Sequence, residues 1–308
     1  MTVILAGGVG AARFLEGLVR VAPQREITVI GNVGDDIEVH GLHVSPDLDI
    51  VLYTLAGLVD PSKGWGFRGD TYHCQNMLRR LGQETWFNLG DRDLATHIYR
   101  TQQLHRGKRL SEVTQYLVRR FRLRIRLLPA TDDPLQTYVL TKAGYVHFED
   151  YMVKLRTIPF VKGVRFKGAE SAKPARHVVR SILKADGVII APSNPIVSIG
   201  AILAVPGIRS ALRRTRARKV GISPIIGGKT VKGPADKLMR ATGFEATAAG
   251  VAECYKDFLD TLIIDRVDSK LAPKIRNLGV EPVATNTLMK RLSEKIRLAR
   301  LAVGETKR

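Results

Sequence analysis

The sequence has little cysteine, few aromatic residues and no long uninterrupted apolar run. Only two cysteines occur among 308 residues, Cys74 and Cys254, and they stand far apart in no metal-ligand spacing. This argues against a disulfide framework and favours a reducing, cytoplasmic location. The most apolar region, residues 187–208, is interrupted by three prolines, so we expect no membrane span there. The first residues lack a basic segment followed by a long apolar stretch, so we expect no signal peptide.

Acidic residues are scarce relative to basic ones. The chain has 49 Lys and Arg against 29 Asp and Glu, a formal net charge of +20. The basic residues concentrate at 119–126, at 213–219 and from Lys290 onward. Only Phe121 interleaves with the first of these segments, and no helix-turn-helix, RNP or zinc-finger spacing occurs. We therefore expect a solvated basic surface that suits acidic substrates, and no specific nucleic-acid binding.

Strand and helix patterns alternate along most of the chain. Such alternation predicts an α/β fold with a mostly parallel sheet and helices on both faces. The apolar runs predict strands near Val3–Leu5, Ile27–Ile30, Gly187–Ala191, Lys219–Ile222, Leu262–Asp265 and Glu281–Ala284. Helical spacing is found near residues 48–55, 71–81, 91–107 and 110–121.

A different pattern of short strands and turns interrupts this alternation. Strands are predicted at Ile125–Leu128, Thr137–Thr141, Val146–Phe148 and Val164–Lys167. The sequence therefore predicts a single α/β domain over 1–308, with an inserted smaller α+β subdomain at about 108–170.

The first predicted strand ends in a glycine-rich turn that leads into a helix. The turn comprises Gly7, Gly8, Val9 and Gly10. Glycine lets the backbone turn sharply and approach a ligand, and the helix that follows directs free N–H groups to the same place. Arg13 stands where the dinucleotide fingerprint has its third glycine, which disfavours a NAD-dependent oxidoreductase and adds a cation for an anion. The turn predicts a phosphate site; the alternative is a tight turn without a ligand.

Polar loops follow three further strands. Asn32 follows the second strand, Ser193 and Asn194 follow a later one, and a loop that ends in Lys229 follows the next. The carboxyl ends of parallel strands meet at one edge of a sheet, where ligands gather. Each loop alone is equally explained by turn chemistry. Together they predict a nucleotide-binding site.

Six aspartates stand at the starts of predicted elements. Carboxylate oxygens are the ligands that Mg²⁺ prefers, and it needs only one or two of them beside substrate phosphates. The alternative role is helix capping, which best suits Asp47, Asp91 and Asp93. The histidines nearby, among them His97, are interpreted as structural. The six residues are Asp35, Asp36, Asp47, Asp49, Asp91 and Asp93.

Several motifs resemble those of the 2-phospho-L-lactate transferases of deazaflavin coenzyme (coenzyme F-420) biosynthesis. They include AGGVGAARFLEGL, GNVGDD, SPDLD, LGDRDLATH, APSNPIVSIGAIL and SPIIGGKTVKGPADKLM, and they extend over almost the whole chain. A related group, the gluconeogenesis factors, shares the nucleotide-binding loops and binds nucleotide sugars without transferring them. That group lacks the LGDRD element, so residues 90–93 favour the transferases.

The resemblance implies an activity and its partners. The family transfers a phospholactyl-type group from a guanosine-diphosphate-linked three-carbon acid to the ribityl hydroxyl of 7,8-didemethyl-8-hydroxy-5-deazariboflavin, and GMP leaves. It also implies a Rossmann-like core, Mg²⁺ as cofactor and a homodimer. The motifs do not distinguish lactate, enolpyruvate and glycerate as the acid. A non-catalytic nucleotide-sugar-binding regulator is the alternative.

The resemblance also assigns residues to roles. The aspartate of SPDLD that contacts the acceptor is Asp49, the expected catalytic residue. Asn88 stands where archaeal members have a lysine, and the acceptor site would also include Asp91 and Asp93. Asp49 is expected to bind Mg²⁺, the acceptor hydroxyl or both, with Asp35 and Asp36 as further metal ligands. Asp47 and Asp49 are two residues apart on a helix, so we expect only one of them to face the substrate.

Overall fold

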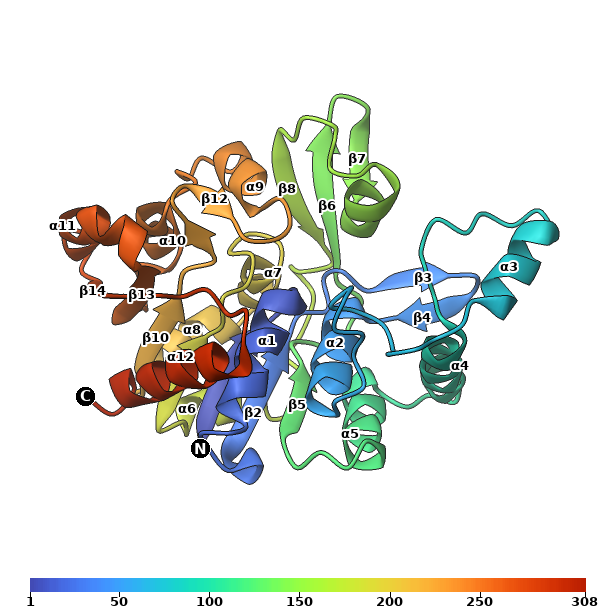
Figure 1. Ribbon diagram of the computed structural model, residues 1–308, viewed down its shortest axis with the longest axis horizontal. Coiled ribbons are helices and arrows are strands. Elements are labelled where there is room, and N and C mark those ends of the chain that lie inside the picture. Colours follow the sequence, from blue (N-terminus) through green and yellow to red (C-terminus); the bar gives the residue numbers. More distant parts are fainter.

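Seven strands form one sheet at the centre of the molecule, and every pairing in it is parallel. Figure 1 shows the computed structural model, which describes residues 1–308. The strand order is β14-β13-β10-β9-β1-β2-β5, which confirms the predicted α/β class. The strands are β1 (Thr2–Ala6), β2 (Ile27–Gly31), β5 (Arg126–Pro129), β9 (Gly187–Ile190), β10 (Arg218–Ile222), β13 (Thr261–Asp265) and β14 (Glu281–Thr285).

The central strands are apolar runs because helices cover both of their faces. All residues of β2, β9 and β13 are buried, and in β1 only Thr2 is partly exposed. In Figure 1, α1 and α12 lie in front of the sheet, with α6 and α8 behind it. The helices are α1 (Gly8–Leu18), α2 (Pro46–Leu55), α3 (His73–Arg80), α4 (Asp91–His105), α5 (Leu110–Arg120), α6 (Val178–Leu183), α7 (Ile199–Ala204), α8 (Ile208–Arg214), α9 (Ala235–Ala241), α10 (Ala248–Tyr255), α11 (Ala272–Arg276) and α12 (Leu292–Glu305).

Helix α1 packs between α2 and α12. A side chain at Gly17 would run into the backbone of Lys295 in α12, so the absence of a Cβ permits this close approach. The predicted helices near 48–55, 71–81, 91–107 and 110–121 are confirmed as α2, α3, α4 and α5. No helix is both long enough and apolar enough to cross a membrane.

Smaller sheets and single turns surround the carboxyl ends of the central strands. Strands β6 (Gln136–Thr141), β7 (Gly144–His147) and β8 (Gly163–Lys167) form an antiparallel sheet, which rises above the central one in Figure 1. Two hairpins pair β3 (Ile37–Val39) with β4 (Leu42–Val44), and β11 (Ile225–Ile226) with β12 (Lys229–Thr230). Two short helical turns also lie there, η2 (Asp150–Lys154) and η3 (Arg266–Leu271), whereas η1 (Gln24–Glu26) precedes β2 at its amino end.

The strand predicted at 125–128 was grouped with the wrong sheet. It is β5, which pairs in parallel with β2 and places Arg126 opposite Thr28. Leu127 and Leu128 are buried in the main core, so this strand extends the central sheet. The other three predicted strands of the insertion are confirmed as β6, β7 and β8. The subdomain limits of about 108 and 170 stay a prediction.

Candidate active site

A cavity of about 600 Å³ opens at the carboxyl ends of the central strands. Ligands of parallel sheets gather at this end, where the loops after several strands meet. Twelve of the residues predicted from the sequence line it: Gly7, Gly8, Val9, Gly10, Arg13, Asp35, Asp47, Asp49, Asn88, Asp93, Ser193 and Asn194. Four others, Asn32, Asp36, Asp91 and Lys229, are not part of its lining.

The glycine turn is held by hydrogen bonds and by its tight packing. The N–H of Gly7 donates to Oγ of Ser193 at 3.1 Å, and the N–H of Gly8 donates to Oδ1 of Asp47 at 2.7 Å. Gly8 has a φ of 73°, a conformation that glycine adopts at little cost. A side chain at Gly10 would collide with the backbone oxygen of Pro192. The missing side chain of Gly10 therefore allows another loop of the protein to pack against it, and its approach to a ligand stays a prediction.

Asn32 orients two carboxylates beneath the cavity. Its side chain is fully buried, and its Nδ2 donates to Oδ2 of Asp47 at 2.9 Å and to Oδ2 of Asp35 at 3.1 Å. Its Oδ1 accepts from the N–H of Gly34 at 2.8 Å. These contacts occupy the amide and keep it out of the cavity. Asn32 is thus placed to position acidic side chains, whereas the sequence had suggested a nucleotide contact.

Three carboxyl groups repel one another at this floor, of which Asp35 and Asp47 are buried and Glu149 is partly exposed. Burial, followed by the charges of Asp47 and Glu149, raises the pKa of Asp35 well above its usual value. Burial raises the pKa of Asp47 to about 6, although Asn32 and Gly8 oppose the shift. Burial and the charge of Asp47 raise the pKa of Glu149 to about 8. A positive charge placed here would relieve the repulsion.

The floor fits a cation that shares its ligands with a substrate. Oδ1 of Asp35 is buried and has no hydrogen-bond partner, so one acceptor is left free. No three Asp, Glu, His or Cys side chains are arranged to hold a metal by themselves. Mg²⁺ is usually bound by one or two carboxylates together with phosphate oxygens, so two suffice here. Asp36 is turned aside, since its Oδ2 accepts from Ser45 at 2.8 Å and lies 2.9 Å from Nε2 of His43.

Asp49 is held by an arginine that the sequence analysis did not identify. Arg100, in α4, is fully buried, and its Nη1 donates to Oδ2 of Asp49 at 3.0 Å while Nη2 donates to Oδ1. Burial alone would lower the pKa of Arg100, but the carboxylate of Asp49 outweighs this and raises it. Such a two-pronged pair fixes the plane of the carboxylate. Asp49 therefore faces the cavity in a single orientation.

The same network continues through His97. Arg100 Nη1 donates to Nδ1 of His97 at 3.2 Å, so the neutral ring carries its proton on Nε2, 3.1 Å from Oδ1 of Asp93. The hydroxyl of Tyr53 donates to the same oxygen at 2.7 Å. The spacing of 97 and 100 places both side chains on the α4 face toward α2. His97 was interpreted as structural; its ring accepts from Arg100, and its buried Nε2 lies near Asp93 without making a hydrogen bond.

The remaining predicted acceptor residues differ in placement. Asn88 is exposed at the cavity and accepts at 3.4 Å from Nε2 of Gln75. Asp91 accepts from Thr71 and from the N–H groups of His73 and Cys74, so it ties down the start of α3. Its contacts are those of a helix-capping residue, the alternative weighed for it above.

Cations stand beside the glycine turn. Arg13 and Lys232 both line the cavity, and burial together with the charge of Arg13 lowers the pKa of Lys232. Lys232 Nζ donates to the backbone oxygen of Lys63 at 3.2 Å. Lys229 is exposed and outside the lining, so Lys232 takes the place that the sequence gave to Lys229. Lys229 begins β12 and Lys232 lies in the segment after it, and only the fold shows which of the two lines the cavity.

An apolar wall completes the cavity. Trp65, Phe87, Phe148 and Met152 line it from separate loops and from η2. Aromatic and thioether side chains provide a flat, adaptable surface for a planar ring. They come from three separate regions of the sequence, and no motif or spacing indicated that they would meet.

The fold and cavity define a Rossmann-like α/β protein with a candidate site for a nucleotide and a second, planar ligand. The family model described as 2-phospho-L-lactate transferase CofD matches residues 2–302. The chain therefore belongs to the 2-phospho-L-lactate transferase family and is a transferase of that family.

Curated relatives agree along the whole chain. A phosphoenolpyruvate transferase of Streptomyces coelicolor is 47% identical, over 98% of this chain and 96% of the relative. A 2-phospho-L-lactate transferase of Methanococcoides burtonii is 40% identical, over 94% of each chain. A solved structure of a UPF0052 family protein from Bacillus halodurans has a TM-score of 0.68 and 19% identity, over 98% of each chain. That last likeness concerns the fold alone.

Proposed function

We propose that this transferase moves a phosphorylated three-carbon acid from a guanosine-diphosphate-linked donor to the ribityl hydroxyl of the deazaflavin named above. The acceptor oxygen bonds to the phosphorus that carries the acid, the bond from this phosphorus to GMP breaks, and GMP leaves. The observation that carries the proposal is the cavity itself, where a helix N-terminus and two cations face a floor of carboxylates. Phosphoryl-type transfer depends mainly on such positioning and charge neutralisation.

The donor would lie over the glycine turn. Val9 and Gly10 present the free N–H end of α1, an 11-residue helix, and Arg13 and Lys232 supply positive charge beside it. Ser193 is engaged by Gly7, and Asn194 Oδ1 accepts from Ile196 at 3.0 Å, so these two side chains shape the opposite edge.

Magnesium is our proposed cofactor, and Asp35 and Asp47 are its proposed ligands. When bound, the ion would neutralise phosphate charge that grows in the transition state. Asp49 has its carboxylate held by Arg100, so we assign to it the acceptor hydroxyl, which can donate to a lone pair that Arg100 leaves free. The apolar wall would take the deazaflavin ring. We also propose a homodimer, which sedimentation would test.

Identity to relatives suggests which acid to test first. The phosphoenolpyruvate transferases of two Streptomyces species are 47% identical to this chain, against 40–41% for two archaeal 2-phospho-L-lactate transferases. We therefore propose that the donor carries enolpyruvate.

The test is GMP release with deazaflavin, Mg²⁺ and each of three donors, which carry enolpyruvate, lactate or glycerate. When the three donors compete directly, we expect the enolpyruvate donor to be used fastest. Release that is fastest with lactate would overturn the choice of acid only. Tight donor binding without GMP release from any donor would favour a nucleotide-binding regulator instead.

A further inference from the structure

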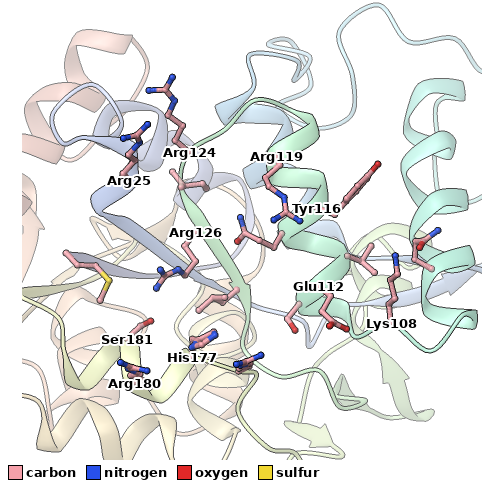
Figure 2. Close-up of a pocket in the computed structure, with 18 of the residues that line it drawn as sticks. Arg25, Lys108, Glu112, Tyr116, Arg119, Arg124, Arg126, His177, Arg180 and Ser181 are labelled. Carbon is pink, nitrogen blue, oxygen red and sulfur yellow. The ribbon is translucent and has the colours of Figure 1, made fainter.

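A second and larger cavity, of about 1060 Å³, lies away from the candidate active site. It starts beside the residues that precede β1 and β2 and runs along β5, the edge strand of the central sheet (Figure 2). Its lining includes Met1, Arg25 and Arg126, which mark the amino ends of three strands. The candidate active site lies at their carboxyl ends, so the two cavities occupy opposite ends of the sheet. We call this one the arginine cavity.

The arginine cavity is lined by eight Lys and Arg side chains and a single acid. The arginines come from separate elements and are Arg25, Arg119, Arg124, Arg126, Arg176 and Arg180. Lys108 and Lys184 add two further charges. None of the eight side chains makes an ion pair or a hydrogen bond with another group of the protein. Figure 2 shows arginines on both sides of β5.

The one acid does not neutralise them. Glu112 accepts from the backbone N–H of Arg109 at 2.9 Å and lies 3.8 Å from the guanidinium of the same residue. It thus caps the start of α5. At the exposed His177, desolvation and then the charges of Arg176, Arg126 and Arg180 lower the pKa.

Protection of an edge strand does not account for this arrangement. A few charges on the strand itself are enough to prevent edge-to-edge pairing. Here, cations from η1, α5 and the start of α6 face the same hollow, where like charges repel. A bound anion with several charges would remove that repulsion.

The lining also indicates which part of a ligand is recognised. The aromatic residues Tyr99 and Tyr116 stack on each other, with ring centroids 5.1 Å apart, and the guanidinium of Arg120 lies over the ring of Tyr116. Each ring therefore already has a stacking partner within the protein. Arginine forks match phosphate oxygens, and a chain of phosphates carries enough charge to engage several of them. We propose that the arginine cavity binds an oligophosphate chain, either free or as the phosphates of a nucleotide whose base stays outside.

The test compares two matched double variants by calorimetry with sodium triphosphate. Arg126→Gln with Arg180→Gln removes two exposed charges from the cavity, and Arg213→Gln with Arg214→Gln removes two exposed charges from α8, outside it. We expect the first pair to weaken binding about tenfold or more and the second less than about twofold. Equal weakening by both pairs, or no binding to the unaltered protein, would overturn the proposal.

Proton NMR of His177 places the ligand independently of any variant. Triphosphate bound beside Arg176 and Arg180 should raise the pKa of His177, and the change should weaken as salt is added. Unmoved His177 signals during saturable binding would contradict the assignment. Triphosphate and ATP are titrated separately, and the one that shifts His177 at lower concentration identifies the source of the phosphates. A single-stranded RNA that binds the same residues more tightly than either would overturn the oligophosphate assignment.

Discussion

The two ends of the central sheet carry unbalanced charge of opposite sign. At the carboxyl ends, buried Asp35 and Asp47 lie near the partly exposed Glu149, and the pKa values of all three are raised. At the amino ends, eight cations surround a cavity without a partner in the protein. Repulsion between like charges lowers the stability of the unliganded protein at both ends, and a ligand of the opposite charge would relieve it. The difference is in burial, since the carboxylates are enclosed and the cations are mostly open to solvent.

The largest effect is expected from Asp49→Asn. It leaves the buried guanidinium of Arg100 unpaired, which should lower the free energy of unfolding by about 3–5 kcal/mol. Turnover should fall on the order of a hundredfold or more. Urea unfolding and GMP release measure the two losses.

A double variant separates the two roles of Asp49. In Asp49→Asn with Arg100→Met, the unpaired charge is gone, so most of the stability should return while turnover stays low. Recovery of turnover along with stability would show that Asp49 serves only the fold.

Asn32→Ala is expected to have the next largest effect. It removes the amide that orients Asp35 and Asp47, and the loss of such a supporting contact commonly costs about 10- to 100-fold in metal affinity. The control is Asn76→Ala, at an exposed site on α3. Magnesium titration monitored by calorimetry would distinguish them, and equal affinities would refute the role of Asn32.

Acidity should act in opposite ways on the free and the magnesium-bound protein. Asp47 and Glu149 have folded-state pKa values of about 6 and about 8, above those of an unfolded chain, so their protonated forms favour the folded state. The contribution of these two groups to the stability of the free protein should be greatest below about pH 4 and should decline as the pH rises toward 8. Magnesium displaces the protons, so its affinity should rise by up to about tenfold per pH unit between 6 and 8. Melting curves with and without Mg²⁺ at pH 6 and pH 8 test this, and a larger stabilisation at pH 6 would count against the site.

The smallest effect concerns the arginine cavity without a ligand. Arg126→Gln with Arg180→Gln should leave stability unchanged or raise it by about 0.5 kcal/mol or less, because repulsion between exposed charges is weak and screened. The gain should disappear in high salt. A clear loss of stability would mean that these arginines make contacts that stabilise the fold by more than their mutual repulsion destabilises it.

The sequence predicted the fold well because apolar runs and glycine turns are local signals. β1, the glycine turn and α1 follow directly from residues 2–18. β5 was assigned to the wrong sheet because arginines at 122, 124 and 126 alternate with apolar residues, as in a half-exposed strand, although only Arg126 belongs to β5. It is an edge strand of a parallel sheet, where one side also remains open.

The sequence predicted where the site lies, and predicted less well which residues contact one another there. Motifs identified twelve residues of the lining, since loops after parallel strands must meet. Arg100 was missed because its partner, Asp49, is 51 residues away in the sequence. Glu149 was missed because the carboxyl group nearest in effect, that of Asp47, lies on another element. Asp47 and Asp49 do point in different directions, yet both line the cavity. Their partners, Gly8 and Arg100, distinguish their roles, and no spacing rule shows such partners.

In the proposed site, Asp35 and Asp47 hold the metal and Asp49 does not. Crystals grown with GDP and Mn²⁺, measured for anomalous scattering from manganese, test it most directly. We expect one peak in contact with the carboxylates of Asp35 and Asp47 and with phosphate oxygens, while Arg100 stays paired with Asp49. A peak on Asp49, with Arg100 displaced, would contradict it.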